Sequence, residues 1–437
     1  MTKVNKNLLG VLPNDDVLSQ CIHCGMCLAT CPTYELTKLE RSSPRGRIKM
    51  IKSVARGEME ISDIFADEMN FCLDCQACET ACPAGVKYGS MVEAARVEVD
   101  NSEYGSFLKK KLKKFVLKYI VASKRNLKIV SRLLYYYQNS FLQKIVNKLC
   151  EFKIFPQRII VLESLSPKVS KKFSDSAIPG IIEAQSEKKY TTAFHYGCLM
   201  NVMFADINKD TVELLSKTGC RIITPKDQQC CGSLHAHNGD FETAKKLARE
   251  NLKAFRKHNY DYLISNSAGC GAFMKEYYHL FSEGSRLKPG EDEPELKKEA
   301  QSFSERVKDL SEFYSNIFPY EFEAATENIT YHDACHLIHS QKIYSQPRKI
   351  INSISGIKYT EMDESTWCCG SAGIYNIVRY EDSMKILERK IKNIEKSGAE
   401  KVITSNPGCI AQIEYGCRKN NLNVKVEHLA TFLNNLT

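Results

Sequence analysis

The sequence predicts a multidomain α+β protein with a helical N-terminal domain, a helical linker and two copies of an α/β domain. Three observations support this fold class. Two matched runs of four cysteines lie in the first hundred residues, and a lysine-rich helical pattern follows them. A second cysteine pattern then occurs twice, with its copies about 138 residues apart. We therefore expect four segments, residues 1–100, 101–190, 191–325 and 326–437.

The composition favours a globular protein with metal-bound thiols. Of the 437 residues, 43% are hydrophobic and 26% are charged, as in ordinary soluble proteins. No apolar run is long enough to span a membrane, and the first residues lack the apolar core of a signal peptide. Nineteen cysteines in such a chain indicate reduced thiolates that bind metal in the cytoplasm, rather than disulfides.

The two N-terminal cysteine runs each fit the spacing C-x2-C-x2-C-x3-C-P, which is typical of ferredoxins with two 4Fe–4S clusters. In that pattern the fourth cysteine of each run ligates the other cluster. We expect one cluster on Cys21, Cys24, Cys27 and Cys82, and the other on Cys72, Cys75, Cys78 and Cys31. A pair of zinc ribbons is the alternative, but zinc ribbons use C-x2-C pairs and not two matched runs of four.

The spacer between the two runs predicts that this ferredoxin domain is helical. Residues 33–71 separate the runs, a longer spacer than compact βαβ ferredoxins have. Within it, residues 47–55 and 63–70 have helical patterns. A domain of this kind relays electrons and carries no substrate chemistry of its own.

The linker is basic and amphipathic. From Lys109 to Lys128 it carries nine basic residues and no acidic one. Leu108, Leu112, Phe115 and Tyr119 recur at helical spacing and predict one apolar face. Two interpretations remain open: the face packs on this protein or on a partner subunit, or the helix lies peripherally on the anionic inner face of a membrane.

The C-terminal half contains a duplication with four cysteines in each copy. His195-Tyr-Gly-Cys198 matches His332-Asp-Ala-Cys335, and both copies contain Cys-Cys-Gly-Ser. We expect metal or cluster binding by Cys198, Cys230, Cys231 and Cys270 in the first copy, and by Cys335, Cys368, Cys369 and Cys409 in the second. The alternative is that these cysteines are packing residues left from a former site. Cys150, Cys220 and Cys417 lie outside the pattern and are predicted to be buried free thiols.

Within the first copy, strands alternate with helices, which indicates a parallel α/β unit. We predict strands at 192–196, 221–224 and 262–265, and helices at 206–218 and 241–258. Each copy ends in a phrase with a helical pattern, 307–314 and 426–433, and the polar stretch 282–299 reads as an inserted loop or short helix. The cysteines follow the strands, at the edge where open α/β sheets place ligands.

Several histidines and the single tryptophan accompany these cysteines. The histidines are His195, His235, His237, His332, His336 and His339. Ligand or proton-delivery roles are one interpretation, and ordinary hydrogen bonding near strand ends is the other. Trp367 precedes Cys368 and is predicted to shield that site from water.

The phrase Ser43-Pro-Arg-Gly-Arg-Ile48 and the second cysteine run, continued to Gly89, resemble the iron–sulfur subunit of bacterial glycolate oxidase. The duplicated Cys-Cys-Gly units resemble the cysteine-rich (CCG) domain which that subunit shares with heterodisulfide reductase, lactate-utilisation proteins and anaerobic glycerol-3-phosphate dehydrogenase. The resemblance implies a partner subunit with FAD that oxidises a 2-hydroxy acid such as glycolate or lactate. This chain would then pass electrons toward quinone or another carrier.

One departure from the family pattern bears on the alternatives. In heterodisulfide reductase each CCG domain supplies a fifth thiolate for a non-cubane cluster, but Phe273 and Gln412 stand at those positions here. A thiol or disulfide reductase is therefore less favoured, as is a metal-free scaffold. No glycine-rich nucleotide loop and no nucleic-acid-binding motif is present, so we expect flavin to bind elsewhere and no nucleic acid to bind.

Overall fold

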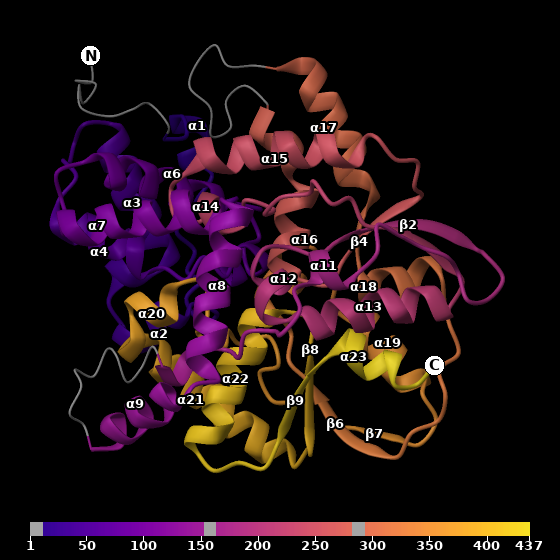
Figure 1. The fold of residues 1–437 in the computed structure, drawn as a ribbon. Coiled ribbons are helices and arrows are strands. Elements are labelled where there is room, and N and C mark those ends of the chain that lie inside the picture. The colour runs from indigo at the N-terminus through magenta and orange to yellow at the C-terminus, as the bar shows by residue number, and fades with distance from the viewer. Residues whose placement is uncertain (1–11, 153–162, 282–292) are drawn as a thin grey trace.

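The computed structural model describes residues 12–152, 163–281 and 293–437. A helical N-terminal domain lies on one side of the molecule, and linker helices lead from it toward two α/β domains (Figure 1). The predicted fold class is confirmed.

The N-terminal domain is built from short helices around an apolar core. They are α1 (Asp15–Leu18), α2 (Pro32–Thr37), the 3₁₀ turn η1 (Glu40–Ser42), α3 (Pro44–Ala55), α4 (Asp63–Phe71), α5 (Ala77–Thr80) and α6 (Tyr88–Asn101). The two helices predicted in the spacer are α3 and α4. Helix α3 begins sharply because the Ser43 hydroxyl accepts a hydrogen bond from the backbone N–H of Gly46 at 3.0 Å, and Pro44 occupies the first helical position.

The linker is helical, as predicted. It comprises α7 (Phe107–Phe115), the π-helix η2 (Val116–Val121), α8 (Lys124–Gln138) and α9 (Phe141–Glu151). Helix α11 (Ser174–Ala177) and strand β1 (Ile181–Ile182) follow. Strand β1, in the segment that we expected to be linker, pairs antiparallel with a strand of the first α/β domain.

The first α/β domain contains a five-stranded sheet in the order β1-β3-β2-β4-β5. The further strands are β2 (Tyr190–His195), β3 (Cys220–Ile223), β4 (Tyr262–Ser265) and β5 (Val307–Asp309), and they are mutually parallel. Its helices are α12 (Leu199–Met203), α13 (Ala205–Lys217), α14 (Ser233–Ala236), α15 (Phe241–Phe255), α16 (Ala268–Lys275), η3 (Tyr277–Phe281), α17 (Pro294–Arg306), α18 (Leu310–Glu312) and η4 (Phe313–Ile317).

The second α/β domain repeats this topology with the strand order β7-β6-β8-β9, all parallel. Its strands are β6 (Glu327–Tyr331), β7 (Ile357–Tyr359), β8 (Lys401–Thr404) and β9 (Lys425–His428). The helices are η5 (His336–Ser340), α19 (Ser345–Ser353), α20 (Tyr375–Val378), α21 (Tyr380–Ser397), α22 (Pro407–Lys419) and α23 (Leu429–Asn434). The order matches β3-β2-β4-β5, so the duplication read from the cysteines extends to the fold.

Two local predictions need correction. The phrases 307–314 and 426–433 are not wholly helical, because each begins as an edge strand (β5 and β9) and becomes helical only afterwards. Pairing with β4 and β8 buries Val307 and Val426, and this tertiary gain outweighs the helical pattern. Of the inserted stretch 282–299, residues 282–292 lie outside the described residues, and α17 begins at Pro294.

The two α/β domains share one hydrophobic core. Phe194, Leu215 and Phe313 of the first copy belong to the same buried cluster as Tyr331 and Phe432 of the second. Helix α13 packs against α23, and the Ala268 N–H donates to the Ser405 carbonyl across the junction. The copies therefore form one packed unit.

Candidate functional site

The first group of four thiols lines a pocket near the surface. Cys21, Cys24, Cys27 and Cys82 line it together with Arg45 and Pro83. The loop turns tightly because His23 and Gly25 have φ angles of 54° and 88°, and a Cβ on Gly25 would lie 2.8 Å from Arg45 Nη1. Cys24 is exposed and the other three are half-buried. The structure thus brings together the four cysteines that the motif assigns to one cluster.

The second group lies deeper. Burial raises the pKa of the Cys78 thiol well above its ordinary value, and the neighbouring Cys75, Cys72 and Cys31 thiolates raise it further. Because this repulsion weakens with distance, Cys31 lies with the three cysteines of the other run. Cys31 immediately precedes α2 and Cys72 immediately follows α4, so the helix ends set their positions. This is the crossed arrangement that the spacing predicts.

A buried arginine supplies positive charge beside the second group. Arg47 on α3 is fully buried, and its Nη1 donates to Thr33 Oγ1 at 3.0 Å while that oxygen lies 3.3 Å from Cys31 Sγ. Burial alone would lower the pKa of Arg47, but the nearby Tyr88, Cys72, Cys31 and Glu68 groups raise it above its ordinary value. The guanidinium therefore stays charged in the interior, where it offsets the negative charge of thiolates.

The four thiols of the first CCG copy form a contiguous chain at the carboxyl edge of the sheet. Cys198 follows β2, Cys230 and Cys231 follow β3, and Cys270 lies on α16 after β4. The Sγ atoms of Cys198 and Cys230 are 3.2 Å apart, and the Cys231 thiol hydrogen-bonds with both Cys230 and Cys270. The Cys230 pKa is lowered well below its ordinary value by hydrogen bonds with Cys198 and Cys231. These thiols are the donor set that a soft metal or an iron–sulfur cluster takes.

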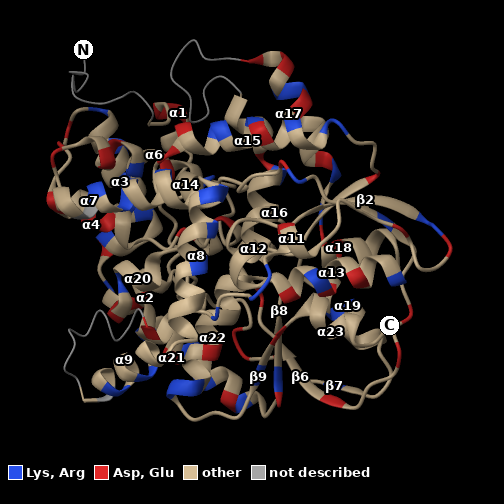
Figure 2. Ribbon diagram, viewed as in Figure 1, with Lys and Arg blue, Asp and Glu red and all other residues tan. Residues whose placement is uncertain are grey.

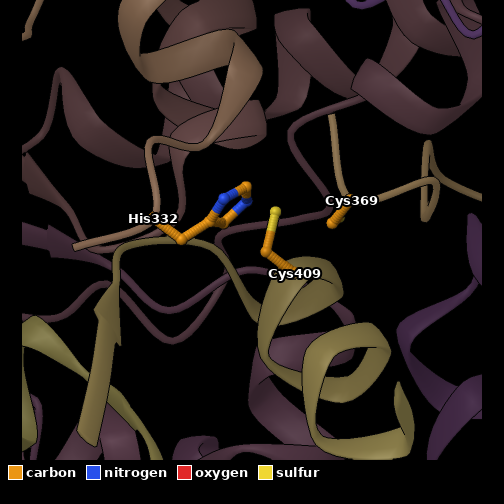
Figure 3. A group of neighbouring side chains, drawn as sticks. All are labelled: His332, Cys369 and Cys409. Carbon is orange, nitrogen blue, oxygen red and sulfur yellow. The ribbon is translucent and has the colours of Figure 1, made fainter. Parts of the chain in front are cut away.

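The four thiols of the second CCG copy converge in the same way. Cys335 follows β6, Cys368 and Cys369 follow β7, and Cys409 lies on α22 after β8. Hydrogen bonds between thiols link Cys335 to Cys368, Cys368 to Cys369 and Cys369 to Cys409. His332 joins this group: a ring nitrogen and the Cys369 and Cys409 sulfurs all lie within 4.8 Å of one another (Figure 3).

The second four-thiol group of the N-terminal domain lies against the second CCG copy. Cys75 packs in one apolar cluster with Cys368, Trp367 and Phe71, and the Cys335 thiolate contributes to raising the Cys75 pKa, after burial. The His336 ring nitrogen Nε2 is 3.1 Å from the Asp74 carbonyl, which fixes the two loops together. Trp367 is 8% exposed and lies between the two thiol groups, where it excludes water.

Comparison with protein-family models matches most of the chain. A 4Fe-4S dicluster domain matches residues 17–86, a glycolate oxidase iron-sulfur subunit linker region matches 108–166, and a cysteine-rich domain matches 192–275 and again 329–414. The order of these matches is the order of the predicted segments.

Whole-chain relatives decide the family. The chain is 37% identical, over 95% of its length and 93% of the relative, to the "Probable glycolate oxidase iron-sulfur subunit" of Bacillus subtilis. This chain belongs to the glycolate oxidase iron–sulfur subunit family. Another relative, the glycolate oxidase iron-sulfur subunit of Escherichia coli, is 28% identical over 91% of the chain and 90% of the relative. Lactate utilization protein A of Bacillus subtilis is 29% identical over 54% of the chain and 96% of the relative.

Five of the six histidines that accompany the cysteines in this family member make ordinary hydrogen bonds. The ring nitrogens contact the Gln229 carbonyl from His195, the Leu117 carbonyl from His235, the Asp74 and Glu93 carboxylates from His237, the Asp74 carbonyl from His336 and the Thr80 hydroxyl from His339. His332 differs, since neither of its ring nitrogens has a hydrogen-bond partner among the described residues. Burial lowers the pKa of His332 well below its ordinary value, and the nearby Lys390 cation lowers it further.

A charged network that the sequence did not indicate joins the N-terminal domain to the first CCG copy. The His237 Nδ1 is 3.1 Å from Asp74 Oδ2 and 2.6 Å from Glu93 Oε1, and Arg96 Nη1 donates to the His237 carbonyl at 2.8 Å. Burial opposes protonation of His237, but hydrogen bonds with Asp74 and Glu93 raise its pKa to about 10. No local pattern connects residues so far apart in the chain.

The positions of the absent fifth cysteines are filled by well-packed residues. Phe273 is 5% exposed and meets the Tyr277 ring edge-on at 5.7 Å between centroids. Gln412 is fully buried, donates to Ser383 Oγ at 2.9 Å and accepts from Asn376 at 2.9 Å. Neither residue supplies a thiolate, so the site of each copy is limited to the four predicted cysteines and neighbouring histidines.

The linker of this family member leaves its apolar face uncovered. Leu108 is 76% exposed, Leu112 64% and Phe115 54%, so the expectation that this face packs on the same chain is wrong for the described residues. Figure 2 shows basic residues along α7 and α8. Yet Lys110, Lys113 and Lys114 bind the end of α6 through the Val99 and Ser102 carbonyls and through Asp100.

Among the described residues, no helix is both long and apolar enough to cross a membrane. Of the three cysteines outside the pattern, Cys220 and Cys417 are buried as predicted, whereas Cys150 on α9 is half-buried.

Proposed function

We propose that this chain is the electron-transfer subunit of a flavin-dependent 2-hydroxy-acid dehydrogenase, with glycolate or lactate as the substrate class. Substrate oxidation would occur on a separate FAD-containing subunit, and electrons would leave toward quinone or another carrier. The observation that carries the proposal is the continuity of thiol groups: one near the surface, a second in the interior, and a third in the second CCG copy in contact with the second. The names of the glycolate oxidase and lactate utilization relatives support the substrate class.

The N-terminal thiols suit two 4Fe–4S clusters. The donor set consists of eight free cysteines in two groups of four, with none in a disulfide. Cys21, Cys24, Cys27 and Cys82 would hold one cluster, and Cys72, Cys75, Cys78 and Cys31 the other. Such clusters supply one-electron carriers whose potentials depend on charge, hydrogen bonds and solvent exposure. Arg47 provides charge and Trp367 excludes water at the interior group.

We further propose that the eight CCG thiols bind metal rather than exchange disulfides. Each copy offers four converging thiols, and Phe273 and Gln412 occupy the places of a fifth. A heterodisulfide reductase-like activity would need those missing thiolates. The free state of all nineteen cysteines supports a reducing compartment, the cytoplasm.

The exposed apolar face of α7 is the surface on which we expect the flavin subunit to dock. Its leucines and phenylalanine have no covering element, and three of the lysines that would attract an anionic membrane are already engaged with α6. An uncovered apolar patch of this kind marks an interaction site. Peripheral membrane contact is the competing interpretation.

The docking surface is tested by replacing both Leu108 and Leu112 with glutamate. The double variant should bind the flavin subunit at least about tenfold more weakly, measured by calorimetry, because two buried apolar contacts are lost. Val378→Glu, at a residue 64% exposed on α20, is the matched control and should bind normally. Unchanged subunit binding, together with release of the double variant from anionic vesicles, would favour the membrane interpretation instead.

The electron-transfer role is tested on the anaerobically purified complex of this chain with its flavin subunit. Adding glycolate or lactate should produce EPR signals of reduced iron–sulfur centres in this chain, with about eight irons belonging to the N-terminal domain. Serine variants of Cys72 should lose substrate-dependent reduction of the acceptor while the flavin is still reduced. A complex that reduces its acceptor equally well without these cysteines would refute the proposal.

A further inference from the structure

The side chain of His332 is buried without a hydrogen bond. It follows β6, is 1% exposed, and is held by its backbone N–H, which donates to the Ile403 carbonyl at 2.9 Å. Neither Nδ1 nor Nε2 has a hydrogen-bond partner among the described residues, although the Ser365 backbone is close by. Burying an imidazole without partners is costly, so native interiors seldom leave one in this state.

The imidazole faces two thiols. One ring nitrogen, Cys369 Sγ and Cys409 Sγ lie within 4.8 Å of one another, and Figure 3 shows the ring beside Cys409. The three side chains come from three different elements: the end of β6, the loop after β7, and α22. Cys369 and Cys409 are 2% and 3% exposed, so the whole group is enclosed.

The first CCG copy lacks this arrangement. His195 occupies the equivalent position, but its Nε2 is 3.1 Å from the Gln229 carbonyl, which gives the ring an ordinary partner. At the position equivalent to Gln229 the second copy has Trp367, and His332 makes no bond to it. The difference between two copies of one fold singles out the second copy as the one with a free imidazole.

We propose that His332, Cys369 and Cys409 bind one tetrahedral ion of the zinc class, with a neighbouring thiolate as the fourth ligand. This inference rests on the proposed binding of metal by the CCG thiols. Around a tetrahedral zinc, sulfur and nitrogen ligands lie about 3.5 to 3.8 Å from one another. Ligand atoms already within 4.8 Å need little movement to reach that spacing, and Cys368, hydrogen-bonded to Cys369, is placed to supply the fourth.

The chemistry of the donor set favours a borderline-soft divalent ion. Two thiolates with an imidazole are a zinc ligand set, whereas a cubane spreads its thiolates over separate corners. Zinc has no redox chemistry, so an ion here would tie β6, the loop after β7 and α22 together. That loop also carries Trp367, which packs against the second N-terminal thiol group. The ion would thereby fix the junction between the N-terminal domain and the second copy.

The test uses the full chain, purified anaerobically from zinc-supplemented medium. Zinc, iron and acid-labile sulfide per chain are measured, with zinc K-edge absorption spectroscopy to identify the ligand atoms. We expect one zinc per chain with mixed nitrogen and sulfur ligands. His332→Ala should lower zinc affinity by more than about tenfold, and the control His195→Ala should leave it unchanged. His332→Cys should retain zinc in an all-sulfur environment.

Several outcomes would overturn the inference: wild-type chain without zinc, zinc with sulfur ligands alone, or His332→Ala with undiminished zinc. Additional iron and sulfide that disappear in His332→Ala would replace the single ion with a cluster. EPR signals of the two N-terminal centres, recorded on the same samples, report folding of each variant. If His332→Ala does not fold, the wild-type ligand spectrum and His332→Cys decide the question. Loss of zinc with intact substrate-dependent EPR signals separates this inference from the electron-transfer proposal.

Discussion

Replacing Arg47 with methionine should lower the reduction potential of the centre on Cys31, Cys72, Cys75 and Cys78. Arg47 is completely buried and stays charged. Thr33 connects it to the centre, because its hydroxyl oxygen is 3.0 Å from Arg47 Nη1 and 3.3 Å from Cys31 Sγ. A positive charge in this position stabilises the reduced, more negative state of a cluster relative to the oxidised state.

The magnitude follows from the contact distances. With the guanidinium roughly 8 Å from the centre of a cluster and an effective dielectric constant of about 20, one unit charge contributes about 2 kcal/mol. For a one-electron couple this corresponds to roughly 90 mV. Glu68, which pairs with both Arg47 and Arg41, offsets part of the effect, and Arg41 continues to pair with Glu68 in the variant. We therefore expect a decrease of about 50 to 100 mV.

The assay is an EPR-monitored redox titration of the anaerobically purified chain. Arg47→Lys retains the charge and should shift the potential by much less. Arg45→Met removes a charge beside the other group of thiols and should move only the other centre. A potential unchanged to within about 20 mV in Arg47→Met, or an equal shift of both centres, would show that the arginine does not set the potential by local charge.

Three further predictions test the ligand assignment, the backbone and the domain junction. Cys31→Ser should remove the EPR signal of the centre on the second cysteine run and spare the other centre; loss of the opposite signal would contradict the crossed arrangement. Gly46→Ala should lower the free energy of unfolding by about 1–3 kcal/mol or more in urea titrations, because its Cβ would lie 1.9 Å from the Glu40 carbonyl oxygen, whereas Gly180→Ala meets nothing within 4 Å and should be neutral. His237 has a pKa raised to about 10 in the folded protein, so its stabilising effect is complete below its ordinary pKa and is lost as the pH rises through 10. The difference in thermal midpoint between wild type and His237→Gln should therefore shrink from pH 7 to pH 10, and a constant difference would refute this linkage.

The sequence predicts those features that depend on local spacing. Cysteines three residues apart, followed by proline, specify which thiols meet, and the structure brings both N-terminal groups together as the spacing requires. Helices α3 and α4 follow from their periodic apolar residues, and the duplicated topology follows from the duplicated cysteines. In each case a short segment contains the whole of the information.

Features that depend on contacts between distant segments were not predictable. The pattern of basic residues in the linker cannot reveal that Lys113 pairs with Asp100 at 2.9 Å, and without that contact the lysines look available to a membrane. Val307 has a helical neighbourhood, but a sheet edge is free beside it and makes it a strand. The contact between Cys75 and Cys368 joins positions almost three hundred residues apart, and no local pattern indicates it.

The single core shared by the two CCG copies has a consequence for how their sites can evolve. Phe194 and Leu215 are buried with Tyr331 and Phe432, so each copy serves as part of the other's interior. Removing either copy would expose the remaining apolar face to water, which makes the pair inseparable for folding. Mutations are thereby constrained in the sheets and helices at the junction, whereas the loops beyond the strand ends are under no such constraint. One ancestral site can then take up two different chemistries within a scaffold that selection keeps intact.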